Sequence, residues 1–150
     1  MIQCSTAFLS YWLHEESYIL LLEFIASMDG MSVTDWVSYE PTNEWEVMMK
    51  KVAEFHHKHD FAGKNGHDMG YRIALTVEEL GELSAAITKG KPLEECAEEM
   101  ADVLILLLGH SIAMKVDLKS AFEKKYHRIM QRKALTGRLG VRVTEYQNKD

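Results

Sequence analysis

The residues best suited to chemistry are two pairs of carboxylates, each spaced three residues apart within a stretch of helical pattern. The pairs are Glu79 with Glu82, in VEELGEL, and Glu99 with Asp102, in EEMADVL. Residues three apart lie on the same face of a helix, so each pair presents two carboxylates in one direction. The short connection at residues 90–92, Gly-Lys-Pro, predicts that the two helices are antiparallel neighbours whose carboxylate pairs face each other.

The negative charge of these pairs has no local compensation. No Lys or Arg occurs between Arg72 and Lys89, or between Lys91 and Lys115. Like charges at this spacing cost roughly 0.2 to 0.5 kcal/mol per pair, and partial burial increases the cost. A bound cation would remove this repulsion. Oxygen ligands, without a His or Cys at matching spacing, favour Mg²⁺ over zinc, with Mn²⁺ as a substitute.

The alternative for any acidic helix face is that water simply solvates it. One isolated pair would favour that alternative, whereas two facing pairs favour a metal site. The remaining acidic residues of these helices are expected to be solvated, or in one case to serve as an outer ligand. They are Glu78, Glu94 and Glu95, expected to be solvated, and Glu98, the candidate outer ligand.

Apolar periodicity and helix-end signals predict an all-α protein with four successive helices after residue 42. The first helix is expected to begin near Asn43 and to end before a glycine-containing loop at residues 61–70. The others are expected at residues 71–89, from Pro92 to about residue 115, and after an N-cap at Asp117. The tail from residue 135 is expected to be loosely held or to form a short strand.

Two apolar stretches are expected to form the centre of this core. The run from Val103 to Leu108 is apolar all round, which is typical of a helix segment that is buried on every side. The preceding helix has an apolar face at helical spacing, which should pack inward. That face contains Ile73, Val77, Leu80, Ser84 and Ile87.

At these residues the sequence resembles the MazG-like all-α nucleoside triphosphate pyrophosphohydrolases, which carry an EExxE motif on one helix and ExxD on the next. Glu78-Glu79-Leu80-Gly81-Glu82 and Glu99-Met100-Ala101-Asp102 match these motifs. The resemblance implies Mg²⁺-dependent cleavage between the α and β phosphates of a nucleotide, giving a nucleoside monophosphate and pyrophosphate. It also implies a four-helix core that forms a homodimer or a dimer of dimers. The nucleobase, and the choice between standard (d)NTPs and modified nucleotides, stay open.

The resemblance also implies roles for individual residues. Glu79, Glu82, Glu99 and Asp102 would hold the metal, and Glu79 or Glu82 would instead orient or deprotonate the attacking water. Lys125 and Arg128, in a KYHR segment, would bind substrate phosphate. The alternative for these two cations is a solvated helix end where the helix dipole favours positive charge.

The histidines near residues 56–67 invite comparison with HD-type phosphohydrolases. They are crowded at the end of one helix and in its loop, so solvated helix-terminal histidines are the main expectation. An alternative left open is that His56 or His59 reaches the nucleotide. His110, within an apolar run, is expected to be a core histidine with satisfied hydrogen bonds.

Length and composition are those of one globular protein of 150 residues with a net charge of −6. The negative charge argues against a nucleic acid polymer as partner, and two cysteines without a C-x-x-C pair indicate a reducing cytoplasm. The expected domains are an N-terminal helical extension and linker (1–40), the catalytic helical domain (41–135) and a tail (136–150). Within the N-terminal region, an amphipathic helix is expected at residues 1–27 and a linker at residues 28–42. Charged residues interrupt the apolar N-terminal stretch, so no membrane span is expected. The rival functional class is a non-catalytic helical interaction module with a vestigial metal site.

Overall fold

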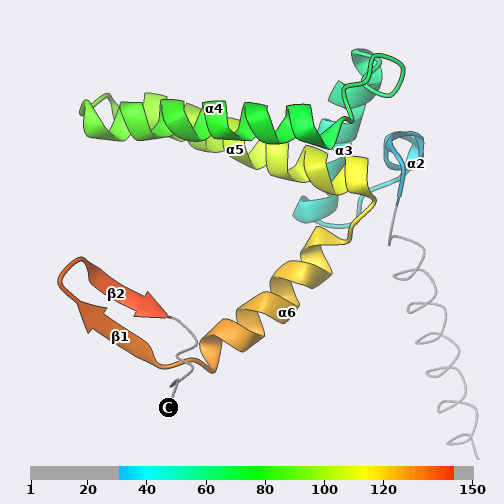
Figure 1. Cartoon of the computed structure of the whole chain (residues 1–150). Helices are drawn as coiled ribbons and strands as arrows, with labels where there is room; N and C mark the ends of the chain where they lie inside the picture. The colour runs from blue at the N-terminus through cyan, green and yellow to red at the C-terminus, as the bar shows by residue number, and fades with distance from the viewer. Residues whose placement is uncertain (1–30, 144–150) are drawn as a thin grey trace, which may run out of the picture. The chain divides into compact units, whose positions relative to one another are not determined.

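The computed structural model describes residues 31–143, and this part of the chain is almost entirely helical (Figure 1). The all-α prediction is confirmed. The helices are α2 (Val33–Ser38), α3 (Glu44–Lys58), α4 (Met69–Thr88), α5 (Leu93–Met114) and α6 (Leu118–Met130). Two short strands follow, β1 (Ala134–Gly137) and β2 (Gly140–Val143). The chain divides after Val116 into two compact units, which are described separately.

Polar side chains fix where most of the helices begin. Asn43, Asp68 and Asp117 each accept a hydrogen bond from the backbone N–H three residues later, which satisfies a donor that the first helical turn leaves unpaired. Pro92 occupies the N-cap position of α5. The starts predicted at Asn43, Pro92 and Asp117 therefore agree with the structure, while α4 begins two residues earlier than expected.

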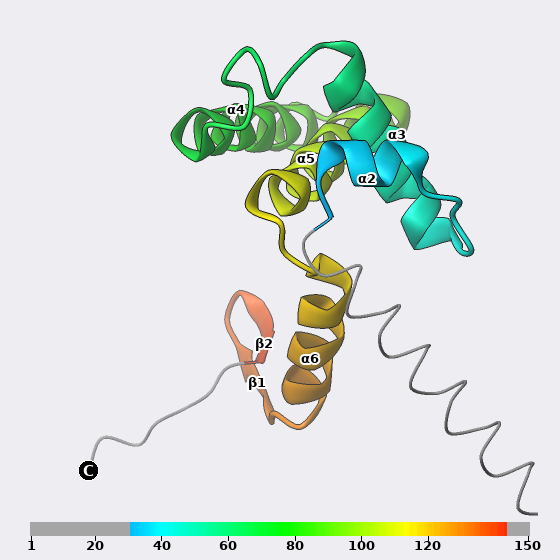
Figure 2. The ribbon, with the colours of Figure 1, turned by 90° about the vertical axis from the view of Figure 1, so that its right-hand side faces the viewer.

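The linker predicted at residues 28–42 is wrong in part, because it contains α2. Ser32 and Asp35 form a reciprocal capping box, in which each side chain accepts a hydrogen bond from the other residue's backbone N–H. Trp36 is buried, and α2 packs against α3 (Figure 2). A capping box and one buried aromatic ring are enough to order this short segment. The helix predicted at residues 1–27 lies outside the described residues.

A buried carboxylate supports the start of α3. Glu46 accepts hydrogen bonds from the backbone N–H of Thr42 at 2.7 Å, from the Thr42 hydroxyl at 2.8 Å and from Nδ2 of Asn43 at 2.6 Å. Burial alone would raise the pKa of Glu46, but these hydrogen bonds, with one from Tyr39, outweigh burial and lower its pKa. Glu46 is therefore a structural anion rather than a candidate ligand.

α4 and α5 form the long antiparallel hairpin that the Gly90-Lys91-Pro92 connection predicted (Figure 1). α3 packs against α5, and the apolar core lies mainly where these two helices meet. The apolar side chains that are buried in the described residues are Trp36, Met49, Val52, Ala53, Ala86, Leu108 and Ile112. The core thus sits beside the C-terminal part of α5, and leaves the opposite end of the hairpin uncovered by α3.

The predicted buried face of α4 is wrong for the described chain. Ile73, Val77, Leu80 and Ile87 are 52%, 65%, 48% and 61% exposed. The inward face is the one that contains the buried Arg72 and Ala86, with Glu79 half-buried between them. Counting apolar residues therefore selected the outer face of this helix.

The expectation for Val103 to Leu108 is also only partly right. Leu108 is buried, but Leu104, Ile105 and Leu107 are each more than 40% exposed. The buried part of α5 lies one turn later, at residues 108–112. A two-helix hairpin cannot cover an all-round apolar segment, because each helix has only one neighbour along most of its length.

The second unit contains α6 and an antiparallel hairpin of β1 and β2. The strands pair Ala134 with Val143 and Leu135 with Arg142, and the chain reverses between Gly137 and Gly140. Every residue of both strands is exposed. The short strand considered for the tail is present. Among the helices of the described residues, none has the length and apolar character needed to span a membrane.

Candidate functional site

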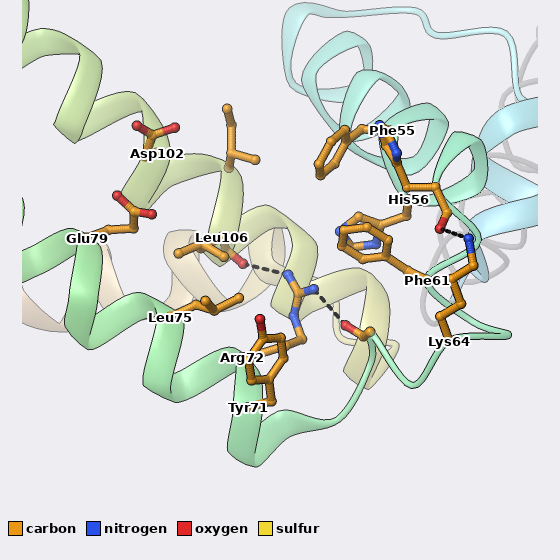
Figure 3. Close-up of a pocket in the computed structure, with 13 residues that line it drawn as sticks. Phe55, His56, Phe61, Lys64, Tyr71, Arg72, Leu75, Glu79, Asp102 and Leu106 are labelled. Atoms are coloured by element: carbon orange, nitrogen blue, oxygen red, sulfur yellow. Dashed lines mark hydrogen bonds between the residues drawn. The ribbon is translucent and has the colours of Figure 1, made fainter.

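Three of the four predicted metal ligands come together between α4 and α5. Glu79, Glu99 and Asp102 each offer a carboxylate oxygen, and these oxygens lie within 4.8 Å of one another. Figure 3 shows Glu79 on α4 and Asp102 on α5 directed toward each other. Glu82, one turn after Glu79, is exposed and does not belong to this group of three. The antiparallel hairpin therefore produces the facing arrangement that the motif spacing predicted.

Repulsion between carboxylates acts on Glu79. The pKa of Glu79 is raised, first by burial and then by the negative charges of Asp102 and Glu82. An ion pair joins Lys91, in the connection between the two helices, to Glu95 on α5, with 3.1 Å between Nζ and Oε2, and it lies outside the cluster. The charge of Glu82 thus contributes to the field at Glu79 even though its side chain is not in the group of three.

A pocket of about 410 Å³ extends from these carboxylates toward the end of α3. Glu79 and Asp102 lie on one side of it, whereas Phe55, His56 and Phe61 line the other side (Figure 3). The pocket thus combines an anionic side, suited to a metal ion, with an aromatic side, suited to a flat ring.

The aromatic side is a packed cluster of rings. Phe61 stacks on His56 with centroids 4.5 Å apart and an interplanar angle of 19°, and meets Phe55 edge-on at 5.2 Å. His59 lies edge-on to Phe55 at 5.0 Å. Phe61 comes from the loop between α3 and α4, residues 59–68, and the other three rings come from the end of α3 or the residue after it.

The prediction that the histidines of this segment are solvated is wrong for His56, which is 2% exposed. His59 is exposed, and both histidines line the pocket. Burial, and then the positive charge of Arg72, lowers the pKa of His56 to about 4. His56 is therefore a neutral ring that packs within the pocket wall.

The prediction that His110 is a satisfied core histidine is confirmed. His110 is 8% exposed, and its Nδ1 accepts a hydrogen bond from Nε of Arg72 at 3.0 Å. Its Nε2 lies 2.8 Å from the hydroxyl of Thr76. Burial, and then the charge of Arg72, lowers the pKa of His110.

Arg72 is a pocket residue that the sequence reasoning missed. It is 2% exposed, and its guanidinium also donates to the backbone carbonyls of Gly66 at 3.1 Å and Leu106 at 3.4 Å (Figure 3). The sequence spacing could have identified Arg72 as a site residue. It lies seven residues, or two helical turns, before Glu79 and hence on the same face of α4. In α4, the position of Arg72 on the same face as Glu79 indicates the inward face correctly, whereas the count of apolar residues does not.

Lys125 and Arg128 lie one turn apart on α6, in the second unit, and both are exposed. Their spacing places both side chains on one face of the helix. The phosphate-binding role stays a prediction.

A comparison with protein families matches residues 46–129, more than half of the chain, to phosphoribosyl-ATP pyrophosphohydrolase. The chain belongs to this family. The match runs from the first turn of α3 to the end of α6, so it includes both carboxylate motifs and the pocket. Comparisons with curated proteins and with solved structures gave no significant match.

Membership of this family confirms the predicted resemblance, since the family is part of the MazG-like all-α group. The protein is a pyrophosphohydrolase, a hydrolase that acts on acid anhydrides of nucleotides. The alternative of a non-catalytic interaction module is accordingly not retained.

Proposed function

We propose that this pyrophosphohydrolase uses Mg²⁺, or Mn²⁺ in its place, to cleave the bond between the α and β phosphates of a triphosphate nucleotide. The products are a nucleoside monophosphate and pyrophosphate. The observation that carries the proposal is the meeting of Glu79, Glu99 and Asp102 at the rim of an aromatic-lined pocket. The anionic side of the pocket suits a metal ion that binds the substrate phosphates, and the aromatic side suits a nucleobase.

The donor set fits a hard divalent cation. Three carboxylates from two helices lie close enough to bind one ion, and no Lys or Arg of α4 or α5 is paired with them. Oxygen-only ligands are the preference of Mg²⁺ and Mn²⁺. When bound, such an ion neutralises phosphate charge and lowers the pKa of a coordinated water.

The protein's own residues would then position and activate water. We assign Glu79 to orient the water and accept its proton, because it lies at the centre of the cluster, and keep Glu82 as the alternative base and fourth ligand. The water oxygen forms a bond to phosphorus, the bond from phosphorus to the bridging oxygen breaks, and pyrophosphate leaves. Lys125 and Arg128 are proposed to stabilise the phosphates.

The aromatic side of the pocket would receive the nucleobase. Phe55, Phe61 and the neutral ring of His56 offer apolar faces and edges against which a purine or pyrimidine can stack. Because the family description contains the name phosphoribosyl-ATP, we include this nucleotide as a candidate substrate beside ordinary NTPs and dNTPs. All of these share the triphosphate that the carboxylate cluster would bind through metal.

We also propose a homodimer, or a pair of dimers, as the functional assembly. The outer face of α4 exposes a row of large apolar side chains, and α5 exposes more between residues 100 and 107. Large exposed apolar surface marks an interaction face in many soluble proteins. A second copy would supply a complementary apolar face and complete the four-helix packing around the hairpin.

The test is pyrophosphate release from NTPs, dNTPs and phosphoribosyl-ATP, with and without Mg²⁺. We expect metal-dependent release that falls by at least about a hundredfold in Asp102→Asn. Glu82→Gln reports whether the exposed fourth carboxylate is needed. Glu94→Gln is the matched control, because Glu94 is exposed on the same helix outside the cluster. Release that does not require metal, or that survives Asp102→Asn, would refute the proposal.

A further inference from the structure

The guanidinium of Arg72 is buried beside the pocket without a carboxylate partner in the described chain. Its three hydrogen-bond acceptors are all neutral: the ring of His110 and the carbonyls of Gly66 and Leu106. Burial lowers the pKa of Arg72. A buried charge without a counter-charge costs stability, so an apolar residue would be better here if packing alone mattered.

The three acceptors lie on two different elements, and two of them, Gly66 and Leu106, line the pocket. Leu106 and His110 lie on α5, whereas Gly66 lies in the 59–68 loop. Arg72 itself is on the first turn of α4, so one side chain joins both helices of the hairpin to the loop that precedes it. Because an arginine has several donors in a rigid fork, it can fix three elements where a lysine would fix fewer.

The loop that Arg72 holds carries part of the pocket wall. The N–H of Gly66 donates to the carbonyl of Phe61 at 2.7 Å, and a Cβ on Gly66 would lie 2.9 Å from the Cβ of Phe61. Gly66 therefore packs directly on Phe61, so a displacement of Gly66 would also displace the Phe61 ring. Phe61 and Lys64 both line the pocket (Figure 3).

Gly109 on α5 constrains the opposite side of the Arg72 guanidinium. A Cβ on Gly109 would overlap Nη2 of Arg72 and would lie 2.9 Å from Nε2 of His56. Glycine at this position lets the guanidinium and the imidazole approach α5 closely. The Thr76 hydroxyl, which donates to the carbonyl of Arg72 at 3.0 Å, lies next to Nε2 of His110 and limits the orientation of that ring.

We propose that Arg72 is a positioning residue for nucleotide binding. It holds the 59–68 loop, with Phe61 and Lys64, at a fixed separation from Glu79 and Asp102. The pocket can then accept the base while the triphosphate reaches the carboxylates. This inference rests on the proposed function for its substrate, but the ordering of the loop by Arg72 is a property of the free protein.

The experiment compares wild type with Arg72→Lys, which keeps the charge and removes the fork. Two readouts are combined: hydrogen exchange of loop amides in the free protein, and KM and kcat with the best substrate of the panel. We expect faster exchange confined to residues 61–66, a KM raised about tenfold, and a kcat within about threefold of wild type. Mn²⁺ affinity, measured without nucleotide, should not change.

Two further variants make the result decisive. Thr76→Val leaves the guanidinium in place but removes the hydroxyl that orients His110. It should therefore increase loop exchange and KM in the same way as Arg72→Lys, but by less. This variant also provides the test if Arg72→Lys does not fold. Lys58→Ala is the matched control, because it removes an exposed cation next to the loop that does not line the pocket, so it should leave both loop exchange and KM unchanged.

The outcomes separate this inference from the proposed function. If wild type hydrolyses no nucleotide, the proposed function fails, while loop exchange still decides whether Arg72 orders the loop. Unchanged loop exchange in both Arg72→Lys and Thr76→Val would overturn the inference. A loss of protection spread evenly over α4 and α5 would also overturn it, because Arg72 would then only stabilise the fold. A fall in kcat at constant KM would overturn it as well.

Discussion

Nε of Arg72 donates a hydrogen bond to Nδ1 of His110 across 3.0 Å in the interior of the α4–α5 hairpin. Because Nδ1 accepts, a neutral His110 carries its proton on Nε2, and that N–H points at the Thr76 hydroxyl 2.8 Å away. The hydroxyl in turn donates to the carbonyl of Arg72. The three residues form a closed set of hydrogen bonds that requires an uncharged imidazole.

Stability should therefore decrease as the pH falls from about 6.5 toward 4. The pKa of His56 is lowered to about 4, and that of His110 is lowered as well, so between these limits the unfolded chain binds protons that the folded chain does not. Each histidine contributes stability that is fully present above its unfolded pKa and is lost as the pH falls. For His56 the loss is on the order of 2 to 3 kcal/mol.

Urea unfolding at several pH values measures this effect. The His56→Gln variant should show a shallower decrease, although it is less stable than wild type at pH 7. His57→Gln is the control, since His57 is an exposed neighbour on the same helix. Equal slopes for wild type and His56→Gln would show that His56 is not the titrating group.

Substitution of Gly109 should be far more costly than substitution of Gly81. In Gly109→Ala the new methyl group would overlap Arg72 and His56, which are both buried, so we expect a loss of about 2 to 3 kcal/mol. A Cβ at Gly81 meets nothing within 4 Å, and alanine is the better helix former, so Gly81→Ala should stabilise by about 0.5 to 1 kcal/mol. Thermal or denaturant unfolding of the two variants tests the pair directly. Similar losses in both would contradict the close packing at Gly109.

Mg²⁺ should stabilise the wild type but not Asp102→Asn. An ion that binds only the folded protein adds about 1.4 kcal/mol at ten times its dissociation constant, because the carboxylates it joins are separated in the unfolded chain. Without metal, Asp102→Asn should be as stable as wild type or slightly more stable, since it relieves repulsion at Glu79. Melting temperatures across a Mg²⁺ titration measure both effects. Glu94→Gln, also on α5 but outside the group of three, serves as the control and should respond to Mg²⁺ like wild type.

A charge on the outer face of α4 should disrupt the proposed dimer. Val77 is 65% exposed in the described chain and lies at the middle of the apolar row. Val77→Lys would bury an unpaired charge in the interface, so it should shift the protein toward monomer in size-exclusion chromatography with light scattering. Glu78→Lys places the same charge beside the row and should leave the assembly unchanged. A monomeric wild type would refute the assembly itself.

The sequence by itself determined the class of the fold, most helix starts and the carboxylate motifs. Helix starts at Asn43 and Asp117 could be predicted because capping is a local interaction between a side chain and a backbone group three residues away. The pairing of Glu79 with Asp102 could be predicted because a four-residue connection leaves adjacent helices few arrangements other than an antiparallel hairpin.

Only the tertiary structure decided which face of each helix turns inward. Periodicity shows that α4 has an apolar face, but the same pattern serves the core of one chain or an interface between chains, so Val77 and Leu80 were assigned to the wrong environment. The inward face instead carries Arg72 and Glu79, and the guanidinium of Arg72 is held there by acceptors on α5 and in the 59–68 loop. Those contacts join residues distant in sequence, and local spacing cannot specify them.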